Sequence, residues 1–286
     1  MEDLTNIGRI KELMERYGFS FSKALGQNFL INPSVCPKIA ELGNAGKGFG
    51  VIEIGTGFGT LTAELAKRAD KVVAVELDSR LMPVLEETLA EYDNVSVINA
   101  DVMKTDLRAV IEDNFAGLET AVCANLPYYI TSPIIMYLLE SRLPIQSITV
   151  MVQKEAGQRL CAKMGTRESS AVTAAVNYYA VPKMLFSVSR GSFMPPPNVD
   201  SCVIRLDVRK EPPIKVKDEK FLFRVIRGAF SQRRKNIVNS LSSALGDMDI
   251  SKENISAAAA DAGISLSARA EQLTLEDYGR LADRLI

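Results

Sequence analysis

The chain has 286 residues, 47% of them apolar and 24% charged, and its basic and acidic residues nearly balance at a net charge of −1. This composition suffices for one large or two modest cores, and no apolar run approaches the roughly 20 residues that span a bilayer. Histidine is absent. Its absence excludes Ser-His-Asp and Cys-His catalysis and histidine-based metal sites, so any chemistry uses carboxylates, amides, aromatic rings, backbone groups or a bound cofactor.

The cysteines and the N-terminus bear on the cellular compartment. Cys36, Cys123, Cys161 and Cys202 lie far apart and form no Cys-X-X-Cys pair, which favours buried reduced thiols over a zinc site or a disulfide framework. The N-terminal residues lack the basic-then-apolar pattern of a signal peptide. We therefore expect a cytoplasmic protein that binds no membrane and no metal. Because no sustained heptad is present, we expect a monomer.

Helical and strand patterns alternate along the first 209 residues. Helices are expected at 5–17, in a short segment ending near Gly43, at 60–68, at 79–91, from Thr131 and at 154–162. Strands are expected at 51–54, 71–76, 95–99, 120–124, 147–152, 181–188 and 201–208. At the 131 helix, Thr131 and Ser132 offer hydroxyls for the cap and Pro133 suits the first turn. The alternation predicts an α/β fold with a parallel sheet covered by helices on both faces.

The pattern changes after the Pro212-Pro213 pair, a plausible linker. Residues 218–286 show only helical periodicity, in about four segments. We therefore predict two domains: an α/β domain over 1–209 and a small helical domain over 210–286.

A glycine-rich turn follows the first strand. Gly55, Gly57 and Gly59 permit a tight turn and a close approach of the backbone to a ligand. Glu76 ends the next strand, where its carboxylate can accept hydrogen bonds from the ribose hydroxyls of an adenosyl group. The Gly-X-Gly-X-Gly spacing lacks the third glycine position used for pyrophosphate, so S-adenosylmethionine is favoured over NAD. Asp101 follows the third strand, where it can accept from the cofactor's adenine amine or simply cap the next turn.

The run Asn125-Leu-Pro-Tyr-Tyr is the more specific signal. The Asn125 side-chain oxygen and the Leu126 carbonyl can hold the hydrogens of an adenine amine and turn its lone pair out of the ring plane. Pro127 keeps the Leu126 carbonyl direction defined, and Tyr128 can stack on the base for about 1–3 kcal/mol. No general base is required before attack. The alternative is an ordinary turn after a strand.

Phe193 begins the proline-rich run 193–199 and looks exposed in the sequence pattern. Its ring can complete the stack on the opposite face of a flipped base. The alternative is a stiff polyproline connector between two strands.

A basic segment lies in the last third of the chain. Residues 203–236 contain 11 lysines and arginines against 4 acids, a net charge of +7. The cluster predicted to bind RNA phosphates comprises Arg224, Arg227, Arg233, Arg234 and Lys235. The alternative is a solvated charged surface.

Taken in order, these motifs resemble those of the ribosomal RNA adenine dimethyltransferases, in the bacterial small-subunit branch also called the kasugamycin-resistance methyltransferases. The resemblance covers almost the whole chain. The matching runs are 25–30, 53–57, Glu76, 99–101, 125–128, 151–155, 193–201 and 230–235. One departure is Thr56, where this branch often has proline.

The resemblance implies a Rossmann-like S-adenosylmethionine-dependent methyltransferase domain followed by a small all-helical RNA-binding domain. It implies dimethylation of two adjacent adenosines near the 3′ end of 16S rRNA in the small ribosomal subunit, coupled to subunit maturation. It also implies that Asn28 and Leu30 close over the cofactor from the N-terminal segment. The implied cofactor contacts are Asn28, Leu30, Gly55, Glu76, Asp101 and Asn125.

Three alternatives stay open. One is a related enzyme that acts on large-subunit RNA and confers macrolide resistance; the length of the C-terminal domain and the Phe193 and Phe230 motifs speak against it. Another is a ribosome-assembly factor that binds RNA and cofactor but acts without catalysis. A weaker third is DNA adenine methylation.

Overall fold

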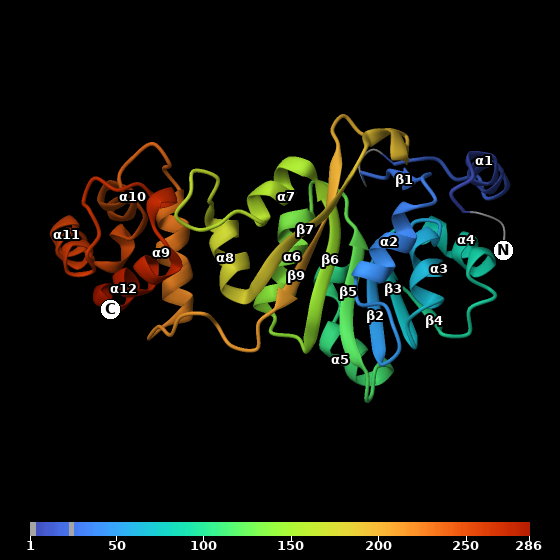
Figure 1. Cartoon of the computed structure of the whole chain (residues 1–286), viewed down its shortest axis with the longest axis horizontal. Coiled ribbons are helices and arrows are strands. Elements are labelled where there is room, and N and C mark those ends of the chain that lie inside the picture. The colour runs from blue at the N-terminus through green and yellow to red at the C-terminus, as the bar shows by residue number, and fades with distance from the viewer. Residues whose placement is uncertain (1–3, 23–25) are drawn as a thin grey trace. The chain divides into compact units, whose positions relative to one another are not determined.

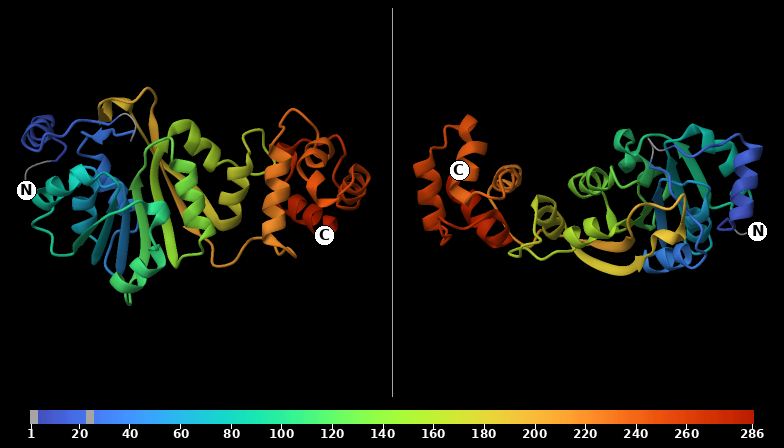
Figure 2. Two further views of the ribbon diagram at one scale, coloured as in Figure 1. Left: turned by 180° about the vertical axis from the view of Figure 1, so that it is seen from behind. Right: turned by 90° about the horizontal axis from the view of Figure 1, so that it is seen from above.

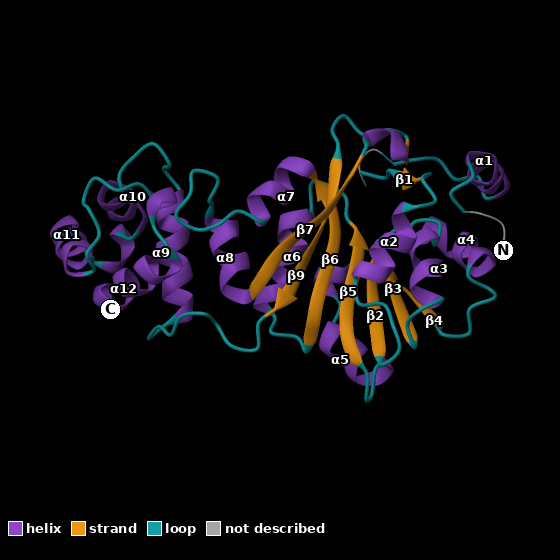
Figure 3. Ribbon diagram, in the orientation of Figure 1, coloured by secondary structure: helices purple, strands orange, loops and turns teal. Residues whose placement is uncertain are grey.

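The computed structural model describes residues 4–22 and 26–286. Leu25, the first residue of the 25–30 motif, lies outside the described residues. Figure 1 labels the elements along the chain, and Figure 3 separates helices from strands by colour.

The chain divides into two compact units that interleave in sequence. They are Met1–Gly157 with Pro182–Val208, and Gln158–Val181 with Arg209–Ile286. The segment 158–181 therefore groups with the C-terminal helices, whereas the predicted domains 1–209 and 210–286 place it in the first domain.

A seven-stranded sheet forms the centre of the first unit, in the order β4-β3-β2-β5-β6-β9-β7. Its strands are β2 (Phe49–Ile54), β3 (Lys71–Glu76), β4 (Val95–Asn99), β5 (Glu119–Asn125), β6 (Ile145–Gln153), β7 (Ala180–Val188) and β9 (Ser201–Val208). The strands from β4 to β6 are parallel. The expectation of a wholly parallel sheet is wrong, because β9 runs antiparallel to β6.

Helices cover both faces of this sheet, as expected for parallel strands joined by crossovers. The helices up to residue 160 are α1 (Ile7–Arg16), α2 (Val35–Leu42), α3 (Thr60–Ala66), α4 (Met82–Thr88), α5 (Leu107–Asn114), α6 (Thr131–Glu140) and α7 (Lys154–Leu160). α2 and α3 lie on one face and α6 on the other (Figures 1 and 2). A short 3₁₀ turn, η1 (Ser79–Leu81), precedes α4.

The predicted hydroxyl cap of α6 is wrong. The helix begins at Thr131 as expected, but Ile130 occupies the cap position and no side chain caps the helix. Thr131 instead donates its hydroxyl hydrogen to the Pro127 carbonyl at 3.2 Å. The hydroxyl therefore closes the turn that precedes the helix rather than capping its N–H groups.

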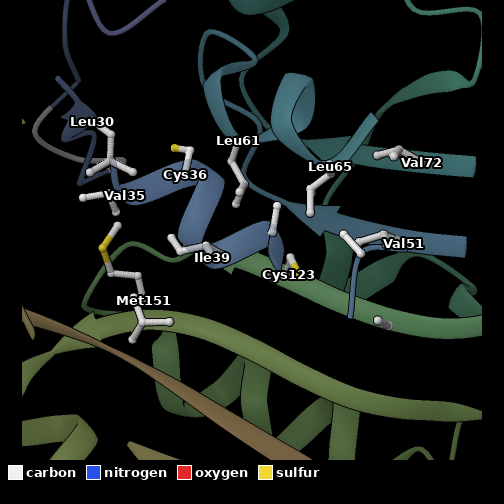
Figure 4. Close-up of a cluster of buried hydrophobic side chains, with 14 of the residues drawn as sticks. Leu30, Val35, Cys36, Ile39, Val51, Leu61, Leu65, Val72, Cys123 and Met151 are labelled. Carbon is white, nitrogen blue, oxygen red and sulfur yellow. The ribbon is translucent and has the colours of Figure 1, made fainter. Parts of the chain in front are cut away.

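An apolar cluster fixes α2 and α3 against the sheet. Figure 4 shows Cys36 and Ile39 of α2 near Leu61 and Leu65 of α3. All four are buried, and burying an aliphatic side chain of this size stabilises the fold by roughly 1.5–3 kcal/mol. A Cβ at Gly43 would lie 2.6 Å from the Cys123 sulfur, so the end of α2 approaches β5 as closely as glycine allows.

The N-terminal segment packs on the same unit through aromatic rings. Phe29 stacks on Phe58 at a centroid distance of 4.4 Å, and the Phe19 ring meets both edge-on. β1 (Phe29–Leu30) pairs antiparallel with β8 (Phe193–Met194). The segment before residue 31 is thereby joined to the proline-rich run before β9.

The second unit is helical. Its helices are α8 (Ala171–Tyr179), α9 (Glu219–Phe230), α10 (Ile237–Ala244), α11 (Lys252–Asp261) and α12 (Leu275–Leu285). The four helical segments expected after residue 218 are confirmed. Tyr178 and Tyr179 of α8 pack against Phe223 of α9 and donate hydrogen bonds to Glu219, which ties α8 to the C-terminal helices. Within the described ranges, no helix is long and apolar enough to cross a membrane.

Candidate functional site

A pocket lies where four parallel strands end. The strand order reverses between β2 and β5, and open α/β sheets bind ligands at such a switch point, outside the carboxyl ends of the strands. The pocket wall contains every residue predicted for cofactor binding or catalysis. They are Asn28, Leu30, Gly55, Gly57, Glu76, Asp101, Asn125, Leu126, Pro127, Tyr128 and Phe193.

Two glycines of the turn after β2 have left-handed backbone angles, with φ of +79° at Gly55 and +59° at Gly57. A Cβ at Gly55 would meet only the Asn125 carbonyl oxygen, at 3.7 Å, whereas one at Gly57 would lie 2.8 Å from the Phe29 ring. Gly55 thus leaves space for a ligand to approach the backbone. Gly57 makes room for Phe29.

Glu76 ends β3 with its side chain almost buried, at 7% exposure. Its Oε2 accepts a hydrogen bond from the Gly57 N–H at 3.0 Å, and its Oε1 accepts one from the Asp78 N–H at 2.9 Å. Burial raises the pKa of this carboxyl, while the two N–H donors act to lower it. Each oxygen keeps a second lone pair, so the carboxylate can still accept hydrogen bonds from two ligand hydroxyls.

Asp101 follows β4 and has two roles in the structure. Its Oδ1 accepts from the Met103 N–H at 3.0 Å, which confirms the capping alternative. Lys104 lies 3.6 Å from Oδ2, and the side chain is about a third exposed and lines the pocket. Capping therefore leaves a carboxylate oxygen available to a ligand.

Asn125 ends β5, and its side chain has no hydrogen-bond partner among residues 4–22 and 26–286. The buried Leu126 side chain anchors the following turn, and the Pro127 carbonyl accepts from the Ile130 N–H at 3.2 Å. The Tyr128 hydroxyl lies 2.8 Å from Ser201 Oγ, and burial raises the pKa of this tyrosine. The ring of Tyr128 is held in the pocket wall beside an amide that is free to bind a ligand.

Phe193 differs from the expectation in its exposure. Its side chain is 3% exposed, so the prediction of an exposed ring is wrong. The backbone of β8 pairs Phe193 with Leu30, and this pairing turns the ring inward. Phe193 still lines the pocket, where it belongs to the wall and does not project from a loop.

Several pocket residues were missed from the sequence. Glu53 of β2 is fully buried, and neither carboxylate oxygen makes a hydrogen bond of ordinary geometry in the described part of the chain. Burial, reinforced by the charge of Glu76, raises its pKa well above the ordinary value, and the nearby Thr62 hydroxyl does not offset this. A charged residue inside an apolar strand was the available signal. Gln27 and Tyr129 also line the pocket, and no local pattern marks them.

The basic cluster lies in the second unit, apart from the pocket residues in sequence and in unit. Arg224 forms an ion pair with Asp247. Arg233 donates to the Arg167 carbonyl at 2.9 Å, so this guanidinium helps to hold the 158–181 segment. The three remaining cations are exposed and have no ion-pair partner among the residues described. They are Arg227, Arg234 and Lys235.

The sheet order, the glycine turn and the ligand groups at the carboxyl edge define the class as a Rossmann-like methyltransferase. Residues 18–286 match the family described as ribosomal RNA adenine dimethylase. The chain belongs to this family and is an S-adenosylmethionine-dependent methyltransferase.

Relatives of similar length support this placement. The chain is 49% identical to ribosomal RNA small subunit methyltransferase A of Geobacillus thermodenitrificans strain NG80-2, over 100% of this chain and 98% of that protein. It is 47% identical to the protein of the same name from Geobacillus sp. strain WCH70, over 99% and 98%.

Two solved structures share the fold over most of the chain. The crystal structure of the 23S rRNA methyltransferase ErmE has a TM-score of 0.67 at 28% identity, covering 90% of this chain and 99% of that one. A dimethyladenosine transferase from Plasmodium falciparum has a TM-score of 0.71 at 25% identity, covering 88% and 95%.

Proposed function

We propose that this enzyme dimethylates the exocyclic amines of two adjacent adenosines near the 3′ end of 16S rRNA, in a small ribosomal subunit that is still maturing. The observation that carries the proposal is the unpartnered Asn125 amide beside the fixed Tyr128 ring, in a pocket that fits an adenosyl cofactor. The small-subunit substrate is supported by relatives that are 47–49% identical over the full chain.

Asn125 and its neighbours would bind the target base. The Asn125 side-chain oxygen and the Leu126 carbonyl accept hydrogen bonds from the amine, so that its lone pair points away from the ring. Pro127 fixes the direction of the Leu126 carbonyl. Tyr128 stacks on one face of the base and Phe193 closes the other side, so that positioning carries most of the catalysis.

The cofactor would bind at the ends of the first three strands of the unit. S-adenosylmethionine supplies an electrophilic methyl group there. Glu76 accepts the ribose hydroxyls, Asp101 accepts from the adenine amine, and the open side of Gly55 admits the ligand to the backbone. Asn28 and Leu30 cover it from the N-terminal segment, and Gly57 supports them through the Phe29 contact.

The helical region 210–286 would act as a small RNA-binding domain. Its basic cluster offers phosphate contacts, chiefly through the exposed Arg227, Arg234 and Lys235. A flipped base costs a few kcal/mol, and less in a loop or an immature RNA. This cost favours an incompletely assembled subunit as the substrate.

The direct test is methyl transfer from labelled S-adenosylmethionine to unmethylated small and large ribosomal subunits, separately, with the product nucleoside identified. Dimethyladenosine in the small subunit alone is expected. Label in the large subunit alone would contradict the proposed substrate and favour the macrolide-resistance type of activity.

A second candidate function is supported by the ErmE likeness, because that protein is named a 23S rRNA methyltransferase. Its identity of 28% is well below the 47–49% found with the small-subunit relatives, which favours the small subunit. An assembly factor that acts without catalysis is the remaining alternative. A transfer-deficient variant that still restored subunit assembly would support it.

A further inference from the structure

Asp78 lies two residues beyond Glu76 and connects the cofactor wall to the N-terminal segment. Its side chain is only 6% exposed. Asp78 Oδ2 accepts a hydrogen bond from Gln27 Nε2 at 2.8 Å, and Oδ1 accepts from Arg80 Nε at 2.8 Å. The Asp78 N–H donates to Glu76 Oε1 at 2.9 Å. One residue therefore contacts both the predicted ribose-binding carboxylate and the segment that covers the pocket.

The Gln27 side is equally well connected. Gln27 Oε1 accepts from the Ser22 N–H at 2.8 Å, so both ends of this amide are bound. The next residues are Asn28, which lines the pocket, and Phe29, whose ring rests against Gly57. Any movement of Gln27 therefore shifts two groups that face the cofactor.

The Asp78 side chain also holds its own backbone in place. Its Oδ1 accepts from the Arg80 N–H at 3.2 Å and so caps the 3₁₀ turn η1. Arg80 in turn lies over the Phe19 ring at 5.0 Å. Without the carboxylate, nothing in this hydrogen-bond set keeps the Asp78 N–H aimed at Glu76.

We propose that Asp78 is a positioning residue for cofactor binding: it sets the Glu76 carboxylate and the Gln27–Leu30 segment in their binding arrangement at the same time. The proposal rests on the cofactor roles proposed above for Glu76, Asn28 and Leu30. It does not depend on which RNA is methylated. Asp78 itself does not touch the reacting groups.

The test measures binding of S-adenosylhomocysteine to the full chain by calorimetry, without RNA. Asp78→Ala and Gln27→Ala are each expected to weaken binding about tenfold, because a hydrogen bond to a charged group is worth at least about 1.5 kcal/mol. The double variant should be no weaker than Asp78→Ala alone, since both changes break one connection. Amide hydrogen exchange at residues 26–30 should speed up in both single variants.

Glu87→Gln is the matched control. Glu87 anchors the same N-terminal region through Tyr17, whose hydroxyl donates to it at 2.6 Å, and through Arg16 at 2.8 Å. It lies outside the pocket wall. Affinity for S-adenosylhomocysteine should stay at the wild-type value in this variant, even if α1 loosens.

Steady-state kinetics separate positioning from general damage. In Asp78→Ala the KM for S-adenosylmethionine should rise while kcat at saturating cofactor stays near wild type; a merely structural defect would lower kcat as well. Wild-type affinity in Asp78→Ala, or fully multiplicative effects in the double variant, would overturn the proposal. If Asp78→Ala does not fold, unchanged binding by Gln27→Ala would overturn it alone. Normal cofactor binding with no methylation of 16S rRNA would count against the proposed function, not against Asp78.

Discussion

Asn125 places a free amide at the carboxyl end of β5, next to the turn that holds Tyr128. Replacing Asn125 with Ala removes an acceptor for the target amine but leaves Gly55, Glu76 and Asp101 in place. We expect methyl transfer to fall by at least about 100-fold, since misplaced reactants lose much of the positioning effect, while S-adenosylhomocysteine binding stays largely intact. Single-turnover transfer to small subunits would measure this.

Asn114→Ala is a suitable control for that variant, because Asn114 bonds only within α5, to the Val110 carbonyl at 2.9 Å. Its activity should match wild type. Full activity in Asn125→Ala would remove the basis for assigning this residue to catalysis.

Glu53 gives a prediction about pH. Burial raises its pKa in the folded protein well above the ordinary value of 4.5, so the folded state holds this proton more tightly than the unfolded chain does. Its contribution to stability is complete below pH 4.5 and is lost as pH rises toward the folded pKa. Glu53→Gln keeps the shape without the titration. The melting temperature of Glu53→Gln relative to wild type should therefore increase from pH 5 to pH 8.

Thermal unfolding across that pH range is the measurement, with Glu119→Gln as a control at an exposed position of β5. A constant difference between Glu53→Gln and wild type would mean that Glu53 does not titrate in this way.

Residues at strand ends could be predicted because their signals are local. Gly55, Glu76 and Asn125 each follow or end an apolar run, and parallel strands bring such ends to one edge. Gln27 and Asp78 could not be paired from the sequence, because their contact joins segments 51 residues apart. The burial of Phe193 likewise depends on its pairing with β1, which no local pattern encodes.

At the scale of elements, strongly periodic segments were predictable and short ones were not. β3 has its predicted bounds, and four helices follow residue 218 as expected. α5 and α8 were missed, although each carries a cap: Asp106 accepts from the Arg108 and Ala109 N–H groups, and Ser170 forms a capping box with Thr173. These caps were readable signals. The antiparallel β9 was not, since strand direction depends on how the chain returns to the sheet.

The crossing of α9 and α10 depends on a glycine. A Cβ at Gly228 would lie 2.8 Å from the Cβ of Ala244, an atom that cannot move away without shifting α10. Gly228→Ala should therefore destabilise the protein by about 1–3 kcal/mol, despite a gain in helix propensity of up to about 1 kcal/mol. Chemical denaturation measures this loss.

Gly279→Ala in α12 is the comparison. There the added Cβ would meet the end of the Ile214 side chain at 3.0 Å, and a terminal methyl can rotate aside. This variant should be close to wild type in stability or above it. Equal stability of the two variants would show that α9 and α10 can separate without cost.

At the scale of the whole molecule, the near-neutral net charge of −1 conceals a segment, 203–236, with a net charge of +7. Composition alone therefore argues neither for nor against RNA, and only the local count points to it. The division into units adds a further effect that no linker signal predicted: the segment 158–181 joins the C-terminal helices. Arg233 supports that grouping through the Arg167 carbonyl, so part of the basic cluster has a structural role.

The last prediction follows from this division of the cluster. Arg234 and Lys235 are exposed without ion-pair partners in the described ranges, whereas Arg224 is already paired with Asp247. If the first two contact phosphates, the variant Arg234→Gln/Lys235→Gln should lower the slope of log affinity against log salt by about 1.4, or about 0.7 for each contact on a single strand. Arg224→Gln should change the slope less, because its charge is partly neutralised by Asp247.

RNA binding measured at several salt concentrations would decide this, with S-adenosylhomocysteine affinity as a check that the pocket is unaffected. Lys163→Gln/Lys252→Gln is the matched control, since both lysines are exposed in the same unit and lie outside 203–236. A control that lowered the slope as much as Arg234→Gln/Lys235→Gln would indicate diffuse attraction by the whole unit. An unchanged slope in Arg234→Gln/Lys235→Gln would exclude these two residues as phosphate contacts, because releasing fewer counterions must flatten the salt dependence.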